Sequence, residues 1–271
     1  MCAICGCSTD HAGPSARAHV HSHADGHSHA YGHSHADGHS HADGHSHAHP
    51  HAREPATLHD LEVRVLAHND AHAASNRRWF AARGIVALNL TSSPGAGKTT
   101  LLERTIRDVG AELSLAVIEG DQETDADARR IRETGCAVIQ LNTGTGCHLD
   151  ATMIERALDQ LSPRERSIVM IENVGNLVCP ALFDLGERAK VVVSSVTEGD
   201  DKPLKYPHMF RAAGLVLLNK LDLLAHVPFD VERFTANVSR VNPNAAVMPV
   251  SALRGEGLDG WYHWLRTQLG A

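Results

Sequence analysis

The chain from residue 57 onward alternates short apolar runs with longer amphipathic stretches. The apolar runs are four to six residues long and rich in β-branched side chains, which is typical of buried strands. They predict strands at 85–90, 115–118, 137–141, 167–171, 191–195, 215–218 and 246–250. Helical spacing predicts helices at 57–84, from 98, from 124, and at 149–161, 207–213, 231–241 and 258–269. This alternation predicts an α/β fold with a mostly parallel sheet covered by helices on both faces.

The first predicted helix begins with apolar residues at helical spacing. Leu58, Leu61, Val65 and Leu66 recur on one side, and Thr57 is the expected N-cap. We expect the helix to continue through Trp79 and Phe80 to Gly84 and to pack against the rest of the domain.

The first 56 residues have a different composition, because fifteen of the 21 histidines lie at or before His59. We therefore expect three parts: a cysteine motif at 1–7, a disordered His-rich tail at 8–56 and a globular domain at 57–271. The net charge of −7 argues against a nucleic-acid-binding surface. No stretch is apolar enough for a membrane span or a signal segment, so we expect a cytoplasmic protein whose six cysteines stay reduced.

A glycine-rich turn separates the first predicted strand from a helix, with the sequence TSSPGAGKTT. Strand, glycine loop, Gly-Lys-Thr and helix form a phosphate-binding loop, although Ser92 stands where the general pattern has its first glycine. Gly95 and Gly97 allow backbone N–H groups to face a phosphate, and Lys98 can reach the β- and γ-phosphates. This predicts a P-loop NTPase. The expected contacts are Ser93, Gly95, Ala96, Gly97, Lys98, Thr99 and Thr100.

Two later strand ends carry residues suited to reading a guanine base. Asn219-Lys220-Leu-Asp222 matches the N-K-x-D element, in which the carboxylate accepts from guanine N1–H and the 2-amino group. Asn219 and Lys220 would orient the loop, and Ser251-Ala252 follows the next strand, where a backbone N–H can contact guanine O6. The ordered set predicts GTP and GDP as ligands rather than adenine nucleotides.

Acidic residues between these motifs predict a magnesium site and a switch. Thr99, Asp121 and Glu172 are the expected magnesium ligands, and Glu172-x-x-Gly175 stands where a GTPase usually has D-x-x-G. We expect Lys98, Asp121 and Glu172 to serve catalysis. No glutamine occupies a clear water-positioning place after Gly175, so we expect slow hydrolysis unless a second subunit or a partner completes the site.

Cysteines and histidines predict metal binding in the first 50 residues. Cys2, Cys5 and Cys7 can converge on one ion with the chain-terminal amine, and Ni(II), Cu(I) or Zn(II) would accept this set. A redox-active C-x-x-C is the alternative, but no strand precedes it. A repeat of His-Ser-His predicts many weak imidazole sites for nickel, zinc or copper, and a solvated spacer is the alternative. Its histidines are His21, His23, His27, His29, His33, His35, His39, His41, His45 and His47.

A second metal site is expected within the globular domain. Cys147-His148 lies on a glycine-rich turn, and Cys179 follows Gly175 inside the expected switch. Three such ligands leave one coordination position open or make a site shared across a dimer. Because Cys179 would move with the switch, we expect metal affinity and nucleotide state to be coupled.

Other histidines and cysteines are interpreted as structural. His68 and His72 are four residues apart on the first helix, and we expect a solvated face there rather than a metal site. Cys136 begins a strand and is expected to fill the core.

Together these motifs resemble the HypB family, the GTPases that help insert nickel into [NiFe]-hydrogenases. The resemblance covers nearly the whole chain: Cys2-x-x-Cys5-x-Cys7, the His-rich tail, SSPGAGKTT, IEGDQET, GTGCHLD, ENVGNLVCP, NKLD and VSAL. It implies a SIMIBI-class G domain that dimerises with GTP. It also implies high-affinity nickel binding at Cys2, Cys5 and Cys7 and weaker nickel or zinc binding at Cys147, His148 and Cys179.

The same resemblance implies partners. They are the hydrogenase large subunit, a HypA-type metallochaperone and a SlyD-type protein, and the histidine tract suggests nickel storage as well. Two alternatives remain open. A urease accessory GTPase shares E-x-x-G and a metal-binding Cys-His, but the N-terminal cysteine motif argues against it. A nickel storage or detoxification protein would make the five nucleotide motifs incidental.

Overall fold

The computed structural model describes residues 58–122 and 125–270. The predicted cysteine motif at 1–7 and the His-rich tail at 8–56 lie outside these ranges. The expectations for Cys2, Cys5, Cys7 and the tail histidines therefore stay predictions.

Seven parallel strands form one sheet in the order β3-β2-β4-β1-β5-β6-β7. The strands are β1 Val86–Ser92, β2 Leu115–Asp121, β3 Ala137–Asn142, β4 Ile168–Glu172, β5 Ala189–Ser195, β6 Ala213–Asn219 and β7 Ala246–Pro249. Each predicted strand is confirmed, and every pairing is parallel where the sequence predicted a mostly parallel sheet. All carboxyl ends therefore meet at one edge, where ligands bind in open α/β sheets.

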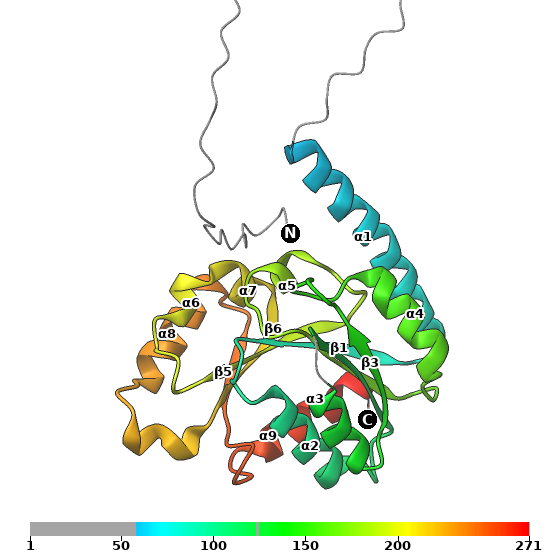
Figure 1. The fold of residues 1–271 in the computed structure, drawn as a ribbon. Helices are drawn as coiled ribbons and strands as arrows, with labels where there is room; N and C mark the ends of the chain where they lie inside the picture. The colour runs from blue at the N-terminus through cyan, green and yellow to red at the C-terminus, as the bar shows by residue number, and fades with distance from the viewer. Residues whose placement is uncertain (1–57, 123–124, 271) are drawn as a thin grey trace, which may run out of the picture. The chain divides into compact units, whose positions relative to one another are not determined.

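Helices cover both faces of this sheet, as predicted (Figure 1). They are α1 Leu58–Ala82, α2 Lys98–Val109, α3 Ala126–Glu133, α4 Ala151–Leu161, α5 Cys179–Leu182, α6 Lys202–Lys205, α7 Pro207–Ala212, α8 Val231–Val241 and α9 Leu258–Leu269, with a 3₁₀ helix η1 at Leu221–His226. Helices α2, α3 and α9 lie on one face, and α1, α4, α7 and α8 lie on the other.

Alternating strand residues build the core on each side. Val86, Leu88 and Leu90 of β1 pack with α2 and α9, whereas the neighbouring Ala87 faces the α1 and α4 side. Burial on both faces explains why the strands appear in the sequence as continuous apolar runs.

The strand β2 extends further than the sequence predicted. Its last three residues are Glu119, Gly120 and Asp121, which lie beyond the predicted end at Ile118. The apolar pattern stops at Ile118 because Asp, Glu and Gly are uncommon in strands. They do so here because β2 ends in a polar pocket at the sheet edge. Glu119 and Asp121 alternate about Gly120 and therefore point to the same side.

Helix α1 packs against the domain, as predicted, but not through its first apolar residues. Leu61 and Val65 are 49% and 48% exposed, and Figure 1 shows the N-terminal part of α1 projecting beyond the sheet. The buried residues of α1 are instead Asn69, Ala73, Asn76 and Phe80. Two of these are polar, so the apolar pattern alone could not reveal this face.

The histidine pair on α1 is only partly solvated. His68 is exposed, but His72 is half-buried and its Nδ1 lies 2.8 Å from Glu155 Oε2 on α4. The prediction of a solvated face is wrong for His72, because α4 packs against it. The prediction that the pair does not bind metal stays a prediction.

Helix α4 begins at Ala151, two residues later than expected, because the Asp150 side chain caps it by accepting from Met153 N. Leu149 therefore belongs to the preceding loop. Within 58–122 and 125–270 no helix is both long enough and apolar enough to cross a membrane.

Gly186 allows a loop to pass directly beneath α1. Its φ is +88°, and a Cβ there would lie 2.6 Å from Ala73 O and 2.9 Å from Arg77 N. Gly186→Ala should therefore push α1 away and lower the free energy of unfolding by about 3 kcal/mol or more, the sum of backbone strain and overpacking. Urea unfolding measures this loss.

Gly135→Ala is the matched control. Gly135 has a φ of +83°, but a Cβ there would have nothing within 4 Å. It should lose only the backbone contribution, about 1–2 kcal/mol. Equal losses in the two variants would contradict the proposed steric role of Gly186.

Candidate functional site

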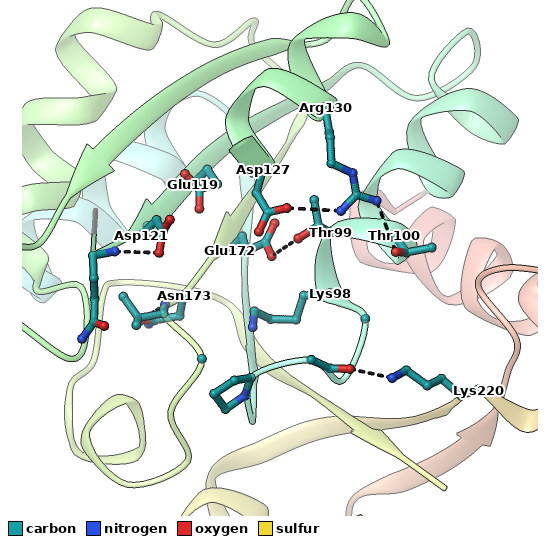
Figure 2. Close-up of a pocket in the computed structure, with 17 residues that line it drawn as sticks. Lys98, Thr99, Thr100, Glu119, Asp121, Asp127, Arg130, Glu172, Asn173 and Lys220 are labelled. Carbon is teal, nitrogen blue, oxygen red and sulfur yellow. Dashed lines mark hydrogen bonds and ion pairs between the residues drawn. The ribbon is translucent and has the colours of Figure 1, made fainter. Parts of the chain in front are cut away.

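A cleft of about 480 Å³ lies at the carboxyl ends of β1, β2 and β4 (Figure 2). It is lined by the glycine loop, by the end of β2, by the segment that follows β4 and by Lys220. The structure thus brings most of the predicted phosphate and magnesium residues into one cleft.

The glycine loop leads into α2 with the geometry a phosphate requires. Gly97 has a φ of +98°, and a Cβ there would lie 2.5 Å from the Asn219 amide nitrogen. Gly97 therefore permits both the turn and the close approach of the predicted base-reading segment. Lys98 is buried, and its Nζ donates to Ser92 Oγ over 2.7 Å. The residue that departs from the general motif thus holds the lysine.

Two buried carboxyl groups lie beside Lys98. Glu172 Oε1 accepts from Thr99 Oγ1 over 2.8 Å, while Glu172 Oε2 and Glu119 Oε2 have no hydrogen-bond partner among the described residues. Burial raises the pKa of Glu119 to about 8 and that of Glu172 to about 7, and Lys98 and Thr99 partly offset the rise for Glu172. Two orphaned buried oxygens need a cation or protons.

Glu119 is a site residue that we did not predict from the sequence. It is 2% exposed, and it pairs in register with Glu172 on the adjoining strand. The alternation of Glu119 and Asp121 about a glycine was the available signal, but it required extending β2. The predicted ligand Asp121 also lines the cleft, and its Oδ1 accepts from Gln122 N.

Helix α3 adds two charged residues that we also did not predict. Arg130 donates to Glu103 Oε2 over 2.6 Å and to Thr100 Oγ1 over 3.3 Å, and it pairs with Asp127. Both Asp127 and Arg130 line the cleft (Figure 2). Only their position in the fold, opposite α2, shows that they belong to the site.

The predicted base-reading residues lie together at the ends of β6 and β7. Asn219 donates to Ala96 O over 2.9 Å and accepts from Ala252 N over 3.0 Å, so it ties the glycine loop to the loop after β7. Ser251 Oγ donates to Asp222 Oδ1 over 2.5 Å. This hydrogen bond orients the carboxylate of Asp222, the residue that the sequence predicts to contact guanine.

Two lysines complete the links between these loops and the glycine loop. Lys220 adopts a left-handed conformation with a φ of +61° and donates to Gly95 O over 2.6 Å. Lys202 of α6 donates to Ser93 Oγ and pairs with Glu198. Lys202 had no motif to mark it in the sequence.

The predicted switch lies against the glycine loop. A Cβ on Gly175 would lie 3.0 Å from Pro94 Cα, so only glycine fits without displacement. This close approach agrees with the predicted contact of Gly175 with a terminal phosphate.

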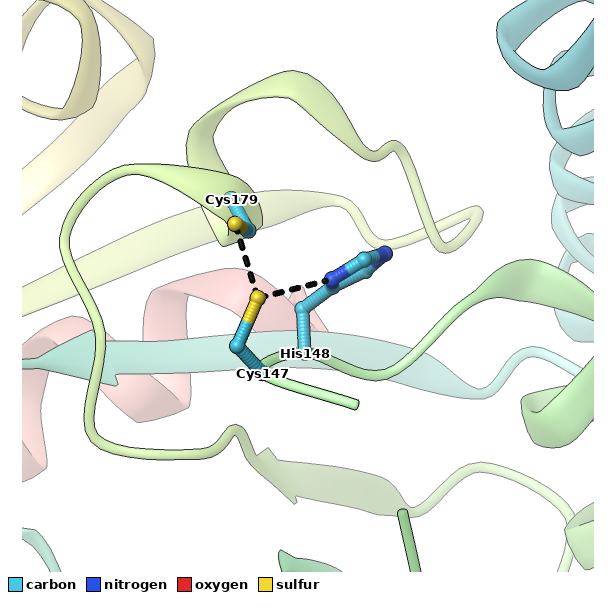
Figure 3. Close-up of side chains that lie close together, drawn as sticks. All are labelled: Cys147, His148 and Cys179. Carbon is cyan, nitrogen blue, oxygen red and sulfur yellow. Dashed lines mark hydrogen bonds between the residues drawn. The ribbon is translucent and has the colours of Figure 1, made fainter. Parts of the chain in front are cut away.

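The structure brings together Cys147, His148 and Cys179, as the sequence predicted (Figure 3). One ligand atom from each lies within 4.8 Å of the others, and the two sulfurs are 2.8 Å apart. Burial lowers the pKa of His148, which keeps the imidazole neutral and able to ligate. Two thiols and one imidazole suit zinc or nickel.

Helix α1 holds the two loops that carry these ligands. Asn69 accepts from Ala151 N and donates to Asp184 O, and Asn76 donates to Ala151 O and Leu185 O. Ala151 lies three residues after His148, and Asp184 lies five after Cys179. The spacing of the two asparagines by two helical turns was the only sequence signal for this role.

Cys136 is half-buried against the core and its thiol donates to Leu115 O, so the core-filling interpretation is confirmed. Desolvation raises the pKa of this thiol to about 11, which makes it a poor nucleophile.

Comparison with known proteins decides the family. Residues 86–249 match the family model described as "CobW/HypB/UreG, nucleotide-binding domain". A hydrogenase maturation factor HypB from Rhizobium leguminosarum bv. viciae is 58% identical over 207 residues, which are 76% of this chain and 69% of that relative. The chain belongs to the HypB family. The family resemblance inferred from the motifs is thus confirmed.

Other HypB-family proteins extend the match. A hydrogenase maturation factor HypB from Cupriavidus necator is 45% identical over 317 aligned residues, covering 98% of this chain and 88% of the relative. The crystal structure of HypB from Helicobacter pylori in complex with nickel has a TM-score of 0.70 at 37% identity, covering 74% of this chain and 94% of that one.

Replacing Glu119 with glutamine should stabilise the protein in chelator, increasingly as pH rises. Between pH 4.5 and about 8 the folded protein keeps a proton on Glu119 that the unfolded chain releases, so the stability of the unaltered protein falls across this window. Glutamine does not titrate. At the upper end Glu119→Gln should raise Tm by at least about 2–4 °C, which is roughly 1 kcal/mol for a domain of this size.

Thermal unfolding in EDTA at the two ends of the window measures the gain. Glu133→Gln, at an exposed position of α3, controls for the substitution itself. A gain that does not change with pH would show that Glu119 is not the titrating group.

Proposed function

We propose that this protein is a GTP-hydrolysing hydrogenase maturation factor, which binds nickel and delivers it to the [NiFe]-hydrogenase large subunit. The observation that carries the proposal is a cluster of soft metal ligands on loops that adjoin a nucleotide cleft. Cys147, His148 and Cys179 provide the ligands. Thr143, four residues before Cys147, donates from its backbone N–H and its hydroxyl to Asp121 O at the end of β2, so the ligand loop is bonded to the cleft. Relatives that carry the name hydrogenase maturation factor support it.

Guanine specificity rests on Asp222. A carboxylate held by Ser251 can accept two hydrogen bonds from the N1–H and 2-amino groups of guanine, and adenine has no matching donor pair. The contacts proposed for the phosphates are those of the glycine loop, with Lys98 as the charged group nearest the β- and γ-phosphates.

Magnesium fits the acidic end of the cleft. Thr99, Asp121 and Glu172 would hold it, and the orphaned oxygen of Glu172 is the observation that favours a cation there. When bound, the ion neutralises charge that develops on the phosphate oxygens. Glu119 would accept a hydrogen bond from a water of the same site.

We expect slow hydrolysis, because no glutamine that could orient the attacking water occurs between Gly175 and β5. We infer that a second copy, joined in a GTP-promoted homodimer, or a partner protein completes the site. A HypA-type metallochaperone and a SlyD-type protein are the proposed partners, and the cytoplasm is the proposed location.

Nickel is the proposed cargo, and nickel or zinc is proposed for the cluster in the domain. Cys2, Cys5 and Cys7 are the proposed high-affinity nickel ligands, with storage in the His-rich tail. A storage or detoxification protein is the rival function. Deleting residues 8–52 tests the storage role of the tail, because loss of hydrogenase activity even when nickel is ample would refute a tail confined to buffering.

The base-reading role of Asp222 predicts a change of nucleotide specificity. Asp222→Asn should weaken GTP binding by about 100-fold or more, because the amide cannot accept from both guanine donors. It should strengthen binding of xanthosine triphosphate, whose 2-oxo group accepts from the new amide. Competition binding with the two nucleotides measures both changes, and an unchanged preference for GTP would refute the role.

Hydrogenase maturation in cells tests the whole proposal. Lys98→Ala should abolish nickel-dependent hydrogenase activity, because it removes the phosphate-binding cation, and Cys147→Ser should reduce it strongly. Arg240→Ala removes an exposed cation on α8 and should leave activity unchanged. Full maturation by Lys98→Ala would favour the storage function.

A further inference from the structure

Asn173 lies at the junction of the nucleotide cleft and the metal loops. It directly follows Glu172, it lines the cleft, and it is 1% exposed. Its Oδ1 accepts from Leu149 N over 3.1 Å and from Val174 N over 3.0 Å, and its Nδ2 donates to Asn89 Oδ1 over 3.3 Å. The bonds to Leu149 and Asn89 lead away from the cleft, whereas Val174 lines the cleft beside Asn173.

Two chains of contacts start at the Asn173 side chain, and we call them arms. The first arm leads to His148. Leu149 follows His148 and is fully buried, and its N–H is held by Asn173. Its side chain packs on Gly120, where a Cβ would lie 2.8 Å from Leu149 Cγ and Cδ1 and 2.9 Å from Cδ2. Because Gly120 separates Glu119 from Asp121, this one leucine is fixed by both acidic strand ends of the cleft.

The second arm leads to the segment after Cys179. Asn89 donates to Glu187 Oε1 over 3.2 Å, and Glu187 Oε2 accepts from Leu185 N over 2.6 Å. Lys190 bridges Glu187 Oε1 and Phe183 O, at 2.8 Å and 2.7 Å.

The two arms meet again at the metal cluster. Phe183 is held by Lys190, and its ring centroid lies 3.9 Å from that of His148. Asn173, Asn89, Glu187 and Lys190 are all at most 8% exposed, so their hydrogen bonds act where water does not compete. A displacement of Asn173 would therefore move both ligand loops rather than break a single contact.

We propose that Asn173 is the positioning residue through which the nucleotide in the cleft sets the geometry, and hence the affinity, of the Cys147–His148–Cys179 metal cluster. This inference rests on the proposed function. It differs from a direct movement of Cys179 because the signal reaches His148 through Leu149 and reaches Phe183 through Asn89 and Glu187.

The test measures cobalt affinity of the full chain carrying Cys2→Ser, Cys5→Ser and Cys7→Ser. Thiolate-to-cobalt absorption then reports the cysteines of the domain and is silent for histidine-only sites in the tail. Each chain is titrated with saturating GDP and with a saturating non-hydrolysable GTP analogue, both with magnesium. The parent chain should show a ratio of affinities of about 5–150-fold, the usual range of coupling between sites.

Asn173→Ala should bring this ratio to within about twofold of one, because both arms lose their common member. Asn89→Ala cuts only the second arm and should lower the ratio while leaving GDP affinity unchanged. It also keeps the test decisive if Asn173→Ala fails to fold. Asn242→Ala is the matched control, because Asn242 is a buried asparagine that donates to Phe210 O, Arg211 O and Ala213 O. It should keep the parental ratio.

Two results would overturn the inference: a parental ratio in both Asn173→Ala and Asn89→Ala, or a ratio of one in the parent chain. A purely structural role would weaken cobalt binding equally with both nucleotides and leave the ratio intact, which also counts against it. A parent chain without any thiolate-to-cobalt signal would instead refute the metal site of the proposed function.

Discussion

The burial of two carboxyl groups beside one lysine is the constraint on which the site depends. Glu172 ends β4, Glu119 lies opposite it in register two residues before the end of β2, and Lys98 is the buried cation beside them. Two carboxylates and one ammonium group carry a net negative charge, and burial disfavours the charged form of each group. Burial therefore raises the pKa values of both acids and lowers the pKa of Lys98. The fold buries these groups, and the charges of a bound magnesium–nucleotide complex would compensate theirs.

The same sheet edge explains why two kinds of site lie so close together. Parallel strands deliver the loops that follow them to one side of the sheet. The loop after β3 carries Cys147 and His148, and the segment after β4 carries Asn173 and, at the start of α5, Cys179. The metal ligands are therefore on loops that adjoin the nucleotide cleft. A longer connection is unnecessary, because Leu149 and Asn173 span the distance with one hydrogen bond.

The sequence predicted the strands well because the central strands are buried on both faces and are therefore strongly apolar, and the half-buried outer strands β3 and β7 keep short apolar runs. It also predicted the convergence of Cys147, His148 and Cys179, because the adjacency of Cys147 and His148 and the place of Cys179 just after Gly175 can be read directly from the sequence. It failed where polar residues are buried: Glu119 was placed outside β2, and Asn69 and Asn76 were not recognised as the packing face of α1. Helices of four residues such as α5 and α6 are too short for any periodic pattern to reveal.

The packing of α1 also determines the order in which the domain can be completed. Asn69 binds Asp184, 115 residues later in the chain. At synthesis rates of about 5–20 residues per second, α1 waits roughly 6–23 s before its partner leaves the ribosome. The first described helix to be made thus completes its contacts only when the segment before β5 has been made. Asparagines at its packing face, in place of leucines, make that surface less prone to aggregate while it is exposed. Their amide groups form hydrogen bonds once the segment with Asp184 has been made.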